Sequence, residues 1–134
     1  MIEVDILDRQ ALASGLPSAA EIRRLCRQAA AAAGVHDGHL AVEFVGAARI
    51  AELNATYRDE PSPTDVLSFP IDRNEPSGEG GVCELGDVVI CAEQTVELRE
   101  AIIHGVLHLA GMDHETDDGE MMALQRALIA AESE

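Results

Sequence analysis

The sequence predicts an α+β fold: a single domain with a small four-stranded mixed sheet packed with about four helices. Short apolar runs typical of strands alternate with longer segments of helical periodicity, in the order β α β α β β α α. The chain has 134 residues, of which 47% are hydrophobic, so it can bury a core of its own. No linker-like or repeated segment divides it, and we expect one domain over residues 1–134.

The first strand and the first helix follow from local patterns. Residues 1–7 alternate apolar and acidic side chains, as a half-buried strand does. Ser18 and Glu21 fit a capping box that opens a helix, and Gly34 provides its stop. This segment therefore predicts a strand followed by an alanine-rich helix.

The middle of the chain predicts a strand, a short helix and a further strand. Apolar residues recur through residues 39–45, and helical spacing follows over residues 47 to about 57. Two prolines within residues 59–63 indicate a loop. Residues 66–71 predict the third strand, which ends near Pro70.

The last third predicts one strand and two helices. Glycine and proline mark residues 74–81 as a loop. The continuous apolar run of residues 87–92 predicts a strand that is buried on both faces. Helices are expected from about Thr95 to Ala110, with a stop at Gly111, and over residues 117–132.

Charge and composition restrict the possible functions. The net charge is -16, and all nine basic residues are arginines, so the surface as a whole repels nucleic acid. Binding of RNA would need a local positive cleft. The chain has one Tyr, two Phe and no Trp, too few for a base-stacking platform. Three cysteines without a CxxC pair, no signal peptide and no apolar span predict a cytoplasmic protein with no membrane association.

The residues with the clearest chemistry are three histidines near the C-terminus. His104 and His108 are four apart on an expected helix, so both rings project from one face. Gly111 then lets the chain turn, which can return His114 to the same point. Three histidine nitrogens with an open fourth position are typical of a catalytic zinc site, so we expect one Zn²⁺ ion held by these side chains.

The neighbours of these histidines limit the reaction. Zinc peptidases of the HExxH type carry a general-base Glu after the first His, where this chain has Gly105. Asp113 either accepts a hydrogen bond from a ligand imidazole or is an ordinary turn residue. His36 and His39 lie in a segment rich in Gly and Asp, where we expect exposed side chains without a function.

Three blocks of the sequence together resemble the YbeY family of bacterial endoribonucleases. They are Leu53-Asn54 and Tyr57-Arg58 followed by PTDVLSFP at residues 63–70, GDVVI at residues 86–90, and HGVLHLAGMDH at residues 104–114. The stretch between Asp87 and His104 is shorter than is usual in that family.

The resemblance implies a function that the histidine spacing alone does not give. It implies that His104, His108 and His114 are zinc ligands and that Arg58 is the functionally important arginine of the family. It also implies single-strand-type endoribonuclease activity in 16S ribosomal RNA 3′-end maturation and ribosome quality control. The implied partners are ribosomal RNA, the small ribosomal subunit and a ribosome-associated GTPase.

Two other functions stay open at this point. A three-histidine zinc site is chemically generic, so the chain could be a zinc hydrolase on a substrate other than RNA. It could also be a ribosome-assembly factor in which zinc is mainly structural, a hypothesis that the acidic charge favours.

Overall fold

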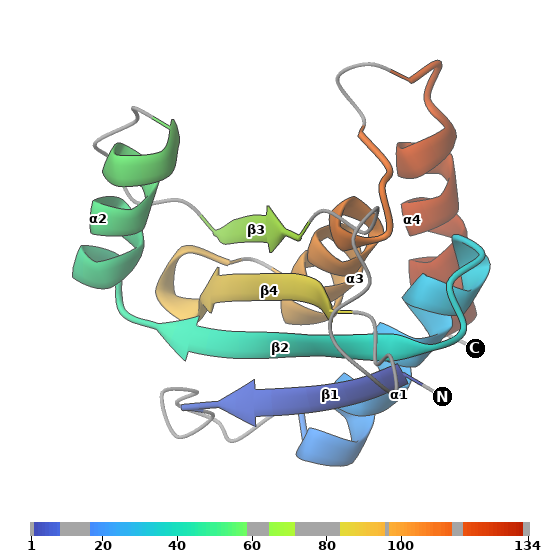
Figure 1. Cartoon of the computed structure of the whole chain (residues 1–134), viewed down its shortest axis with the longest axis horizontal. Coiled ribbons are helices and arrows are strands. Elements are labelled where there is room, and N and C mark those ends of the chain that lie inside the picture. The colour runs from blue at the N-terminus through green and yellow to red at the C-terminus, as the bar shows by residue number, and fades with distance from the viewer. Residues whose placement is uncertain are drawn as a thin grey trace.

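A single four-stranded sheet is the centre of the molecule. The computed structural model describes residues 2–8, 17–58, 65–71, 84–95, 97–113 and 117–132. The strands are β1 (Ile2–Leu7), β2 (Gly38–Val45), β3 (Val66–Pro70) and β4 (Glu84–Cys91), arranged in the order β1-β2-β4-β3. β1, β2 and β4 run parallel and β3 is antiparallel to β4, so the predicted mixed sheet is confirmed (Figure 1).

Helices cover the two faces of this sheet unequally. They are α1 (Ala19–Ala32), α2 (Ala47–Arg58), α3 (Leu98–Leu109) and α4 (Glu120–Glu132), with a short 3-10 turn η2 (Ala92–Gln94) before α3. Val88 and Ile90 of β4 pack in the large core with α1, α3 and α4. Val89 and Cys91 point to the opposite face and pack in a smaller core with Ile50 of α2. The last half of β4 is therefore buried on both faces, as predicted.

Three predicted boundaries were wrong. The last helix begins at Glu120 rather than near Asp117, because the Asp117 carboxylate instead accepts from the Gly119 and Met121 backbone N–H groups. β4 begins at Glu84 rather than Asp87, because it passes through an irregular register beside β2 at Gly86, which has a φ of 129°. The next helix begins at Leu98 rather than near Thr95. Thr95 Oγ instead donates to the Cys91 carbonyl at 2.6 Å, and Glu97 caps the helix by accepting from the Arg99 backbone N–H. The loops expected at residues 59–63 and 74–81 lie outside the described residues.

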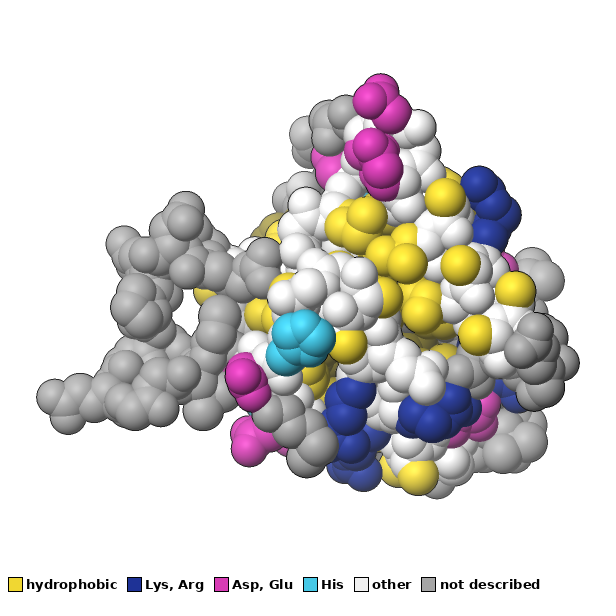
Figure 2. Space-filling model, turned by 90° about the vertical axis from the view of Figure 1, so that its right-hand side faces the viewer, with side chains coloured by type: hydrophobic (Ala, Val, Ile, Leu, Met, Phe, Trp, Pro, Cys, Tyr) yellow, Lys and Arg dark blue, Asp and Glu magenta, His cyan; other side chains and the backbone are white. Residues whose placement is uncertain are grey.

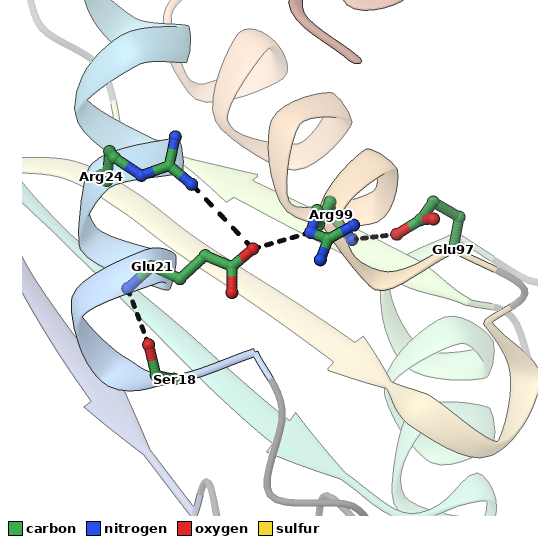
Figure 3. Close-up of polar contacts among 5 residues, drawn as sticks. All are labelled: Ser18, Glu21, Arg24, Glu97 and Arg99. Carbon is green, nitrogen blue, oxygen red and sulfur yellow. Dashed lines mark hydrogen bonds and ion pairs between the residues drawn. The ribbon is translucent and has the colours of Figure 1, made fainter. Parts of the chain in front are cut away.

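Polar contacts join the first turns of α1 and α3. The Ser18 hydroxyl accepts from the Glu21 backbone N–H at 3.1 Å, which confirms the Ser18 half of the predicted capping box. The Glu21 carboxylate accepts from Arg99 Nε at 2.7 Å, and its Oε1 lies 4.0 Å from the Arg24 guanidinium (Figure 3). Glu21 thus ties the start of α1 to the start of α3, two segments that are far apart in the sequence.

Two arginines of α1 donate hydrogen bonds to backbone carbonyls of β1, the strand at one edge of the sheet. β1 is an end strand, and an end strand presents backbone groups that other chains could pair with. Arg27 Nε donates to the Ile2 carbonyl at 2.9 Å, and Arg23 Nε donates to the Val4 carbonyl at 3.3 Å. Both guanidinium groups therefore serve the fold. Among the described helices, none combines the length and apolar character that a membrane span requires.

Candidate metal centre

The two histidines of α3 lie at the edge of the large core. Seven other residues of this helix are buried, namely Ala101, Ile102, Ile103, Gly105, Val106, Leu107 and Leu109. His104 and His108 are half-buried, so their rings occupy the partly open side of the helix. The two ring centroids are 4.8 Å apart and the ring planes meet at 75°. The structure thus places both rings together, as their spacing predicted.

Gly105, between the two histidines, lets α3 approach the sheet closely. A Cβ atom at this position would lie 2.4 Å from Val88 Cγ1 and 3.0 Å from Val88 Cγ2. The Gly105 carbonyl also accepts from the Ser68 hydroxyl of β3 at 3.2 Å. Because even a methyl group clashes here, the general-base Glu of the HExxH peptidases has no room at this position.

Helix α3 ends at Leu109, one residue after His108, and the chain turns out of the helical path at Gly111. Gly111 has a φ of 100°, a conformation that side chains other than glycine adopt with strain. Its backbone N–H donates to the His108 carbonyl, and the Met112 N–H donates to the Leu107 carbonyl, both at 3.0 Å. This pair of bonds is the Schellman motif of a helix terminus and confirms the predicted stop. His114 lies outside the described residues, so its role as third ligand stays a prediction.

A buried amide holds the ring of His104. Gln125 of α4 is only 3% exposed, and its Oε1 lies 2.7 Å from His104 Nδ1. On the other side of the amide, Gln125 Nε2 donates to Glu100 Oε1 at 2.8 Å. Neither Gln125 nor Glu100 was predicted as a site residue from the sequence. The available signal was a glutamine at an inward position of α4, four residues after the buried Met121.

A cavity of about 450 Å³ opens beside His104. Its lining includes the carboxyl-bearing residues Asp65, Glu97 and Glu100 together with His104 and Gln125. One histidine of the proposed metal centre is therefore reached from a space large enough for part of a substrate. The walls of this space contribute no Lys or Arg from the described residues.

Arg58 is the last residue of α2, and its side chain lies outside what the structure describes, so its role stays a prediction. The neighbouring Tyr57 ring packs edge-on against Phe69 of β3, with centroids 5.1 Å apart. The adjacent Ser68 is the residue that bonds to the Gly105 carbonyl on α3. The end of α2 therefore contacts the strand that also contacts the histidine helix.

The prediction for the remaining histidines was half wrong. His36 is exposed, as expected. His39 lies within β2 and is half-buried, with Nδ1 2.7 Å from Glu84 Oε2 and Nε2 2.8 Å from Asp5 Oδ2. The hydrogen bond to Glu84 raises the pKa of His39 above its usual value, and the hydrogen bond to Asp5 adds a smaller effect in the same direction. His39 therefore links three neighbouring strands, which the local sequence could not indicate.

The described residues contain no cluster of three or more His, Cys, Asp or Glu side chains able to hold a metal ion. Since His114 is not among those residues, the expected ligand set extends beyond them. His104 and His108 nevertheless suit zinc, because their rings project together from one helix and the Nδ1 atom of His104 is already bonded to a protein oxygen.

Comparison with known proteins decides the family. The model of the family described as Endoribonuclease YbeY matches residues 16–132. This chain belongs to the YbeY family.

Relatives and a solved structure agree with this assignment. The chain is 35% identical to the Endoribonuclease YbeY of Kineococcus radiotolerans, with 96% of this chain and 85% of the relative aligned. It is 38% identical to that of Thermobifida fusca, with 87% and 88% aligned. The solution structure of TM1509 from Thermotoga maritima matches with a TM-score of 0.53 and 26% identity, over 94% of this chain and 86% of that protein. The resemblance noted in the three sequence blocks is confirmed.

Proposed function

We propose that this YbeY family member is a zinc-dependent, single-strand-type endoribonuclease that trims the 3′ end of 16S ribosomal RNA precursors and acts in ribosome quality control. The observation that carries the proposal is the family match over residues 16–132, which includes Arg58 and all three histidines. The relatives named above are described as endoribonucleases, and the paired rings of His104 and His108 suit a hydrolytic metal centre.

In this proposal His104, His108 and His114 hold one Zn²⁺ ion. When bound, zinc would polarise a phosphoryl oxygen and lower the pKa of a bound water molecule to about 7. The protein orients the ligands: Gly105 seats α3 against Val88, and Gly111 ends the helix just before the segment that carries His114. The cavity beside His104 would receive part of the RNA strand.

Arg58 is proposed to stabilise negative charge on the phosphate. A guanidinium group is planar, permanently charged and able to donate two parallel hydrogen bonds to neighbouring oxygens. Such a group lowers the barrier when it faces the oxygens on which negative charge develops during cleavage. The contact between Tyr57 and β3 supports this role, because it ties the end of α2 to the strand that packs on the histidine helix.

The charge of the chain supports recruitment through partners. On the face shown in Figure 2, most of the arginine side chains gather in the lower part with acidic side chains beside them, hydrophobic side chains are scattered over the part above, and further acidic side chains lie at the top. With a net charge of -16, long-range attraction of free RNA is unfavourable. We therefore propose that the small ribosomal subunit and a ribosome-associated GTPase bring this protein to its RNA, in the cytoplasm.

The same charge favours one alternative function. In that alternative the protein assists ribosome assembly, zinc holds the fold, and the chain does not cleave RNA. The two functions differ in what removal of the metal does. Loss of zinc abolishes cleavage in the first and lowers the stability of the fold in the second.

Metal content and cleavage test the proposal together. Purified protein should contain about one zinc, and His108→Ala should lose it, whereas His36→Ala, at an exposed position, should retain it. A structured precursor of the ribosomal RNA 3′ end should be cut by the wild type, and a chelator should stop the cut. Full zinc retention by His108→Ala, or cleavage that is insensitive to chelator, would overturn the proposal.

Charge reversal at two positions of α2 distinguishes a specific role of Arg58 from a general effect of charge on this helix. Arg58→Glu should abolish cleavage while zinc stays bound. Arg49→Glu is the matched control, because Arg49 lies on the same helix and is exposed beside Glu52. It should keep wild-type cleavage. Equal activity of both variants would refute the role of Arg58.

A further inference from the structure

The hydrogen bonds around Gln125 can run in only one direction. A carboxylate accepts hydrogen bonds and does not donate them, so Glu100 Oε1 must face the NH₂ group of the amide. This fixes the orientation of the Gln125 side chain and turns its oxygen toward His104. The amide oxygen also only accepts, so the proton of the neutral imidazole must sit on Nδ1 of His104. The lone pair of that ring is then on Nε2.

We propose that Gln125 is the positioning residue of the metal centre: oriented by Glu100, it selects the Nδ1–H tautomer of His104 and presents Nε2 to the metal. The inference rests on the proposed function only for the identity of the metal. A histidine ligand depends on the partner of its other ring nitrogen, which fixes both the tautomer and the rotation of the ring. Gln125 is that partner here.

The packing of α4 makes Gln125 a rigid partner. The residue is 3% exposed, and the completely buried Met121 lies one helical turn before it. Within the described residues no buried side-chain nitrogen or oxygen is left without a hydrogen-bond partner, so the amide has both of its ends engaged. A different side-chain orientation would break both of these part-buried hydrogen bonds.

This arrangement makes α4 a determinant of the site on α3. His104 and Glu100 are four residues apart on α3, and the Gln125 amide bridges them from the neighbouring helix. Displacement of α4 would therefore turn the His104 ring without any change in the ligands themselves. His108 contributes its ring from the next turn of the same helix.

The tautomer can be measured without metal and without activity. Long-range ¹H–¹⁵N spectra of the metal-free full chain should show His104 with its proton on Nδ1. In Gln125→Leu, which is similar in size but accepts no hydrogen bond, that resonance pattern should shift toward the Nε2–H form. The exposed His36 should be unchanged in both proteins. An unchanged His104 pattern in Gln125→Leu would overturn the inference.

Zinc affinity gives the second measurement, by competition with a chelating indicator. Gln125→Leu should bind zinc about 10–100-fold more weakly, the usual effect of losing the hydrogen-bond partner of a ligand histidine. The double variant Glu100→Gln with Gln125→Glu exchanges the two groups. The carboxylate at position 125 then accepts from His104 Nδ1–H, and the amide at position 100 donates to that carboxylate. This exchange should recover most of the affinity, which a loss of packing alone would not predict.

A control and the wild type separate the two proposals. Gln94→Leu changes an amide in the lining of the same cavity, on the turn before α3, and should leave zinc affinity unchanged. If the wild type binds no zinc, the proposed function fails, while the tautomer measurement still tests Gln125. If the wild type binds zinc and Gln125→Leu binds it equally well, the positioning role fails alone.

Discussion

Replacing Gly105 with alanine would test how closely the histidine helix must approach the sheet. The added Cβ would lie 2.4 Å from Val88 Cγ1, whereas carbon atoms in favourable contact are about 3.5–4.0 Å apart. Val88 is 0% exposed and lies in the large core, so it has no open space to turn into. Relief of the clash therefore requires α3 and β4 to separate by about 1 Å.

Two opposing effects set the size of the change. Forcing an extra methyl group into a packed core costs about 1–3 kcal/mol, and a contact as short as 2.4 Å places this change in the upper part of that range, about 2–3 kcal/mol. Alanine in a helix interior is favoured over glycine by about 1 kcal/mol, which offsets part of that cost. We expect Gly105→Ala to lose roughly 1–2 kcal/mol of unfolding free energy. With a urea dependence of about 2 kcal/mol per molar, the unfolding midpoint should fall by roughly 0.5–1 M.

A double-mutant cycle identifies Val88 as the cause. Val88→Ala removes both Cγ atoms that lie closest to the added methyl group. In that background Gly105→Ala should be neutral or stabilising, so the two changes should be coupled by more than about 1 kcal/mol. A midpoint for Gly105→Ala at or above the wild-type value would refute the reasoning. So would an equal loss in both backgrounds.

Three further predictions concern the cap, the strands and the charge. Ser18→Ala should lower the unfolding free energy by about 1 kcal/mol, because the Glu21 N–H loses its acceptor, whereas Ser18→Asp should keep most of it; equal urea midpoints would contradict this. His39→Gln should destabilise the fold most at low pH: bonds to Glu84 and Asp5 raise the His39 pKa above 6.5, so its contribution is complete below pH 6.5 and is lost as the pH rises through the raised value. A gap in unfolding midpoint that widens with pH would refute it. Binding of single-stranded RNA by the isolated chain should depend weakly on salt, with a log–log slope shallower than about −2, because few phosphates are neutralised; a slope steeper than that would show an extended basic surface and contradict the prediction.

Local patterns predicted the helices and strands because the residues that favour each element lie within that element's own segment. The four strands and four helices occur in the predicted order, and the stops at Gly34 and Gly111 are where glycine relieves a left-handed backbone. The histidine pair was predictable for the same reason, since a spacing of four fixes the shared face of a helix.

The missed features depend on partners that are distant in the sequence. His39 is held by Asp5 and Glu84 only because β1 and β4 pair on either side of β2. Gln125 meets His104 only because α4 packs on α3. The inward position of Gln125 on α4 could be read from its own segment, but its partner could not, and the carboxylates that hold His39 are ordinary residues in their own segments.

The distribution of arginine explains how an acidic chain could act on RNA. Arg23 and Arg27 bond to carbonyls of the end strand, and Arg99 bonds to Glu21. These guanidinium groups stabilise the fold and are not directed toward a substrate. The proposed function therefore assigns the positive charge near the phosphate to the zinc ion and Arg58, a small centre that can stabilise charge over a short range. Such a centre, next to a cavity lined in part by Asp65, Glu97 and Glu100, would attract RNA weakly from a distance at physiological salt, where screening sets in at about 8 Å. The proposed function therefore assigns recruitment to a basic partner, which would raise the local concentration of RNA without taking part in the reaction.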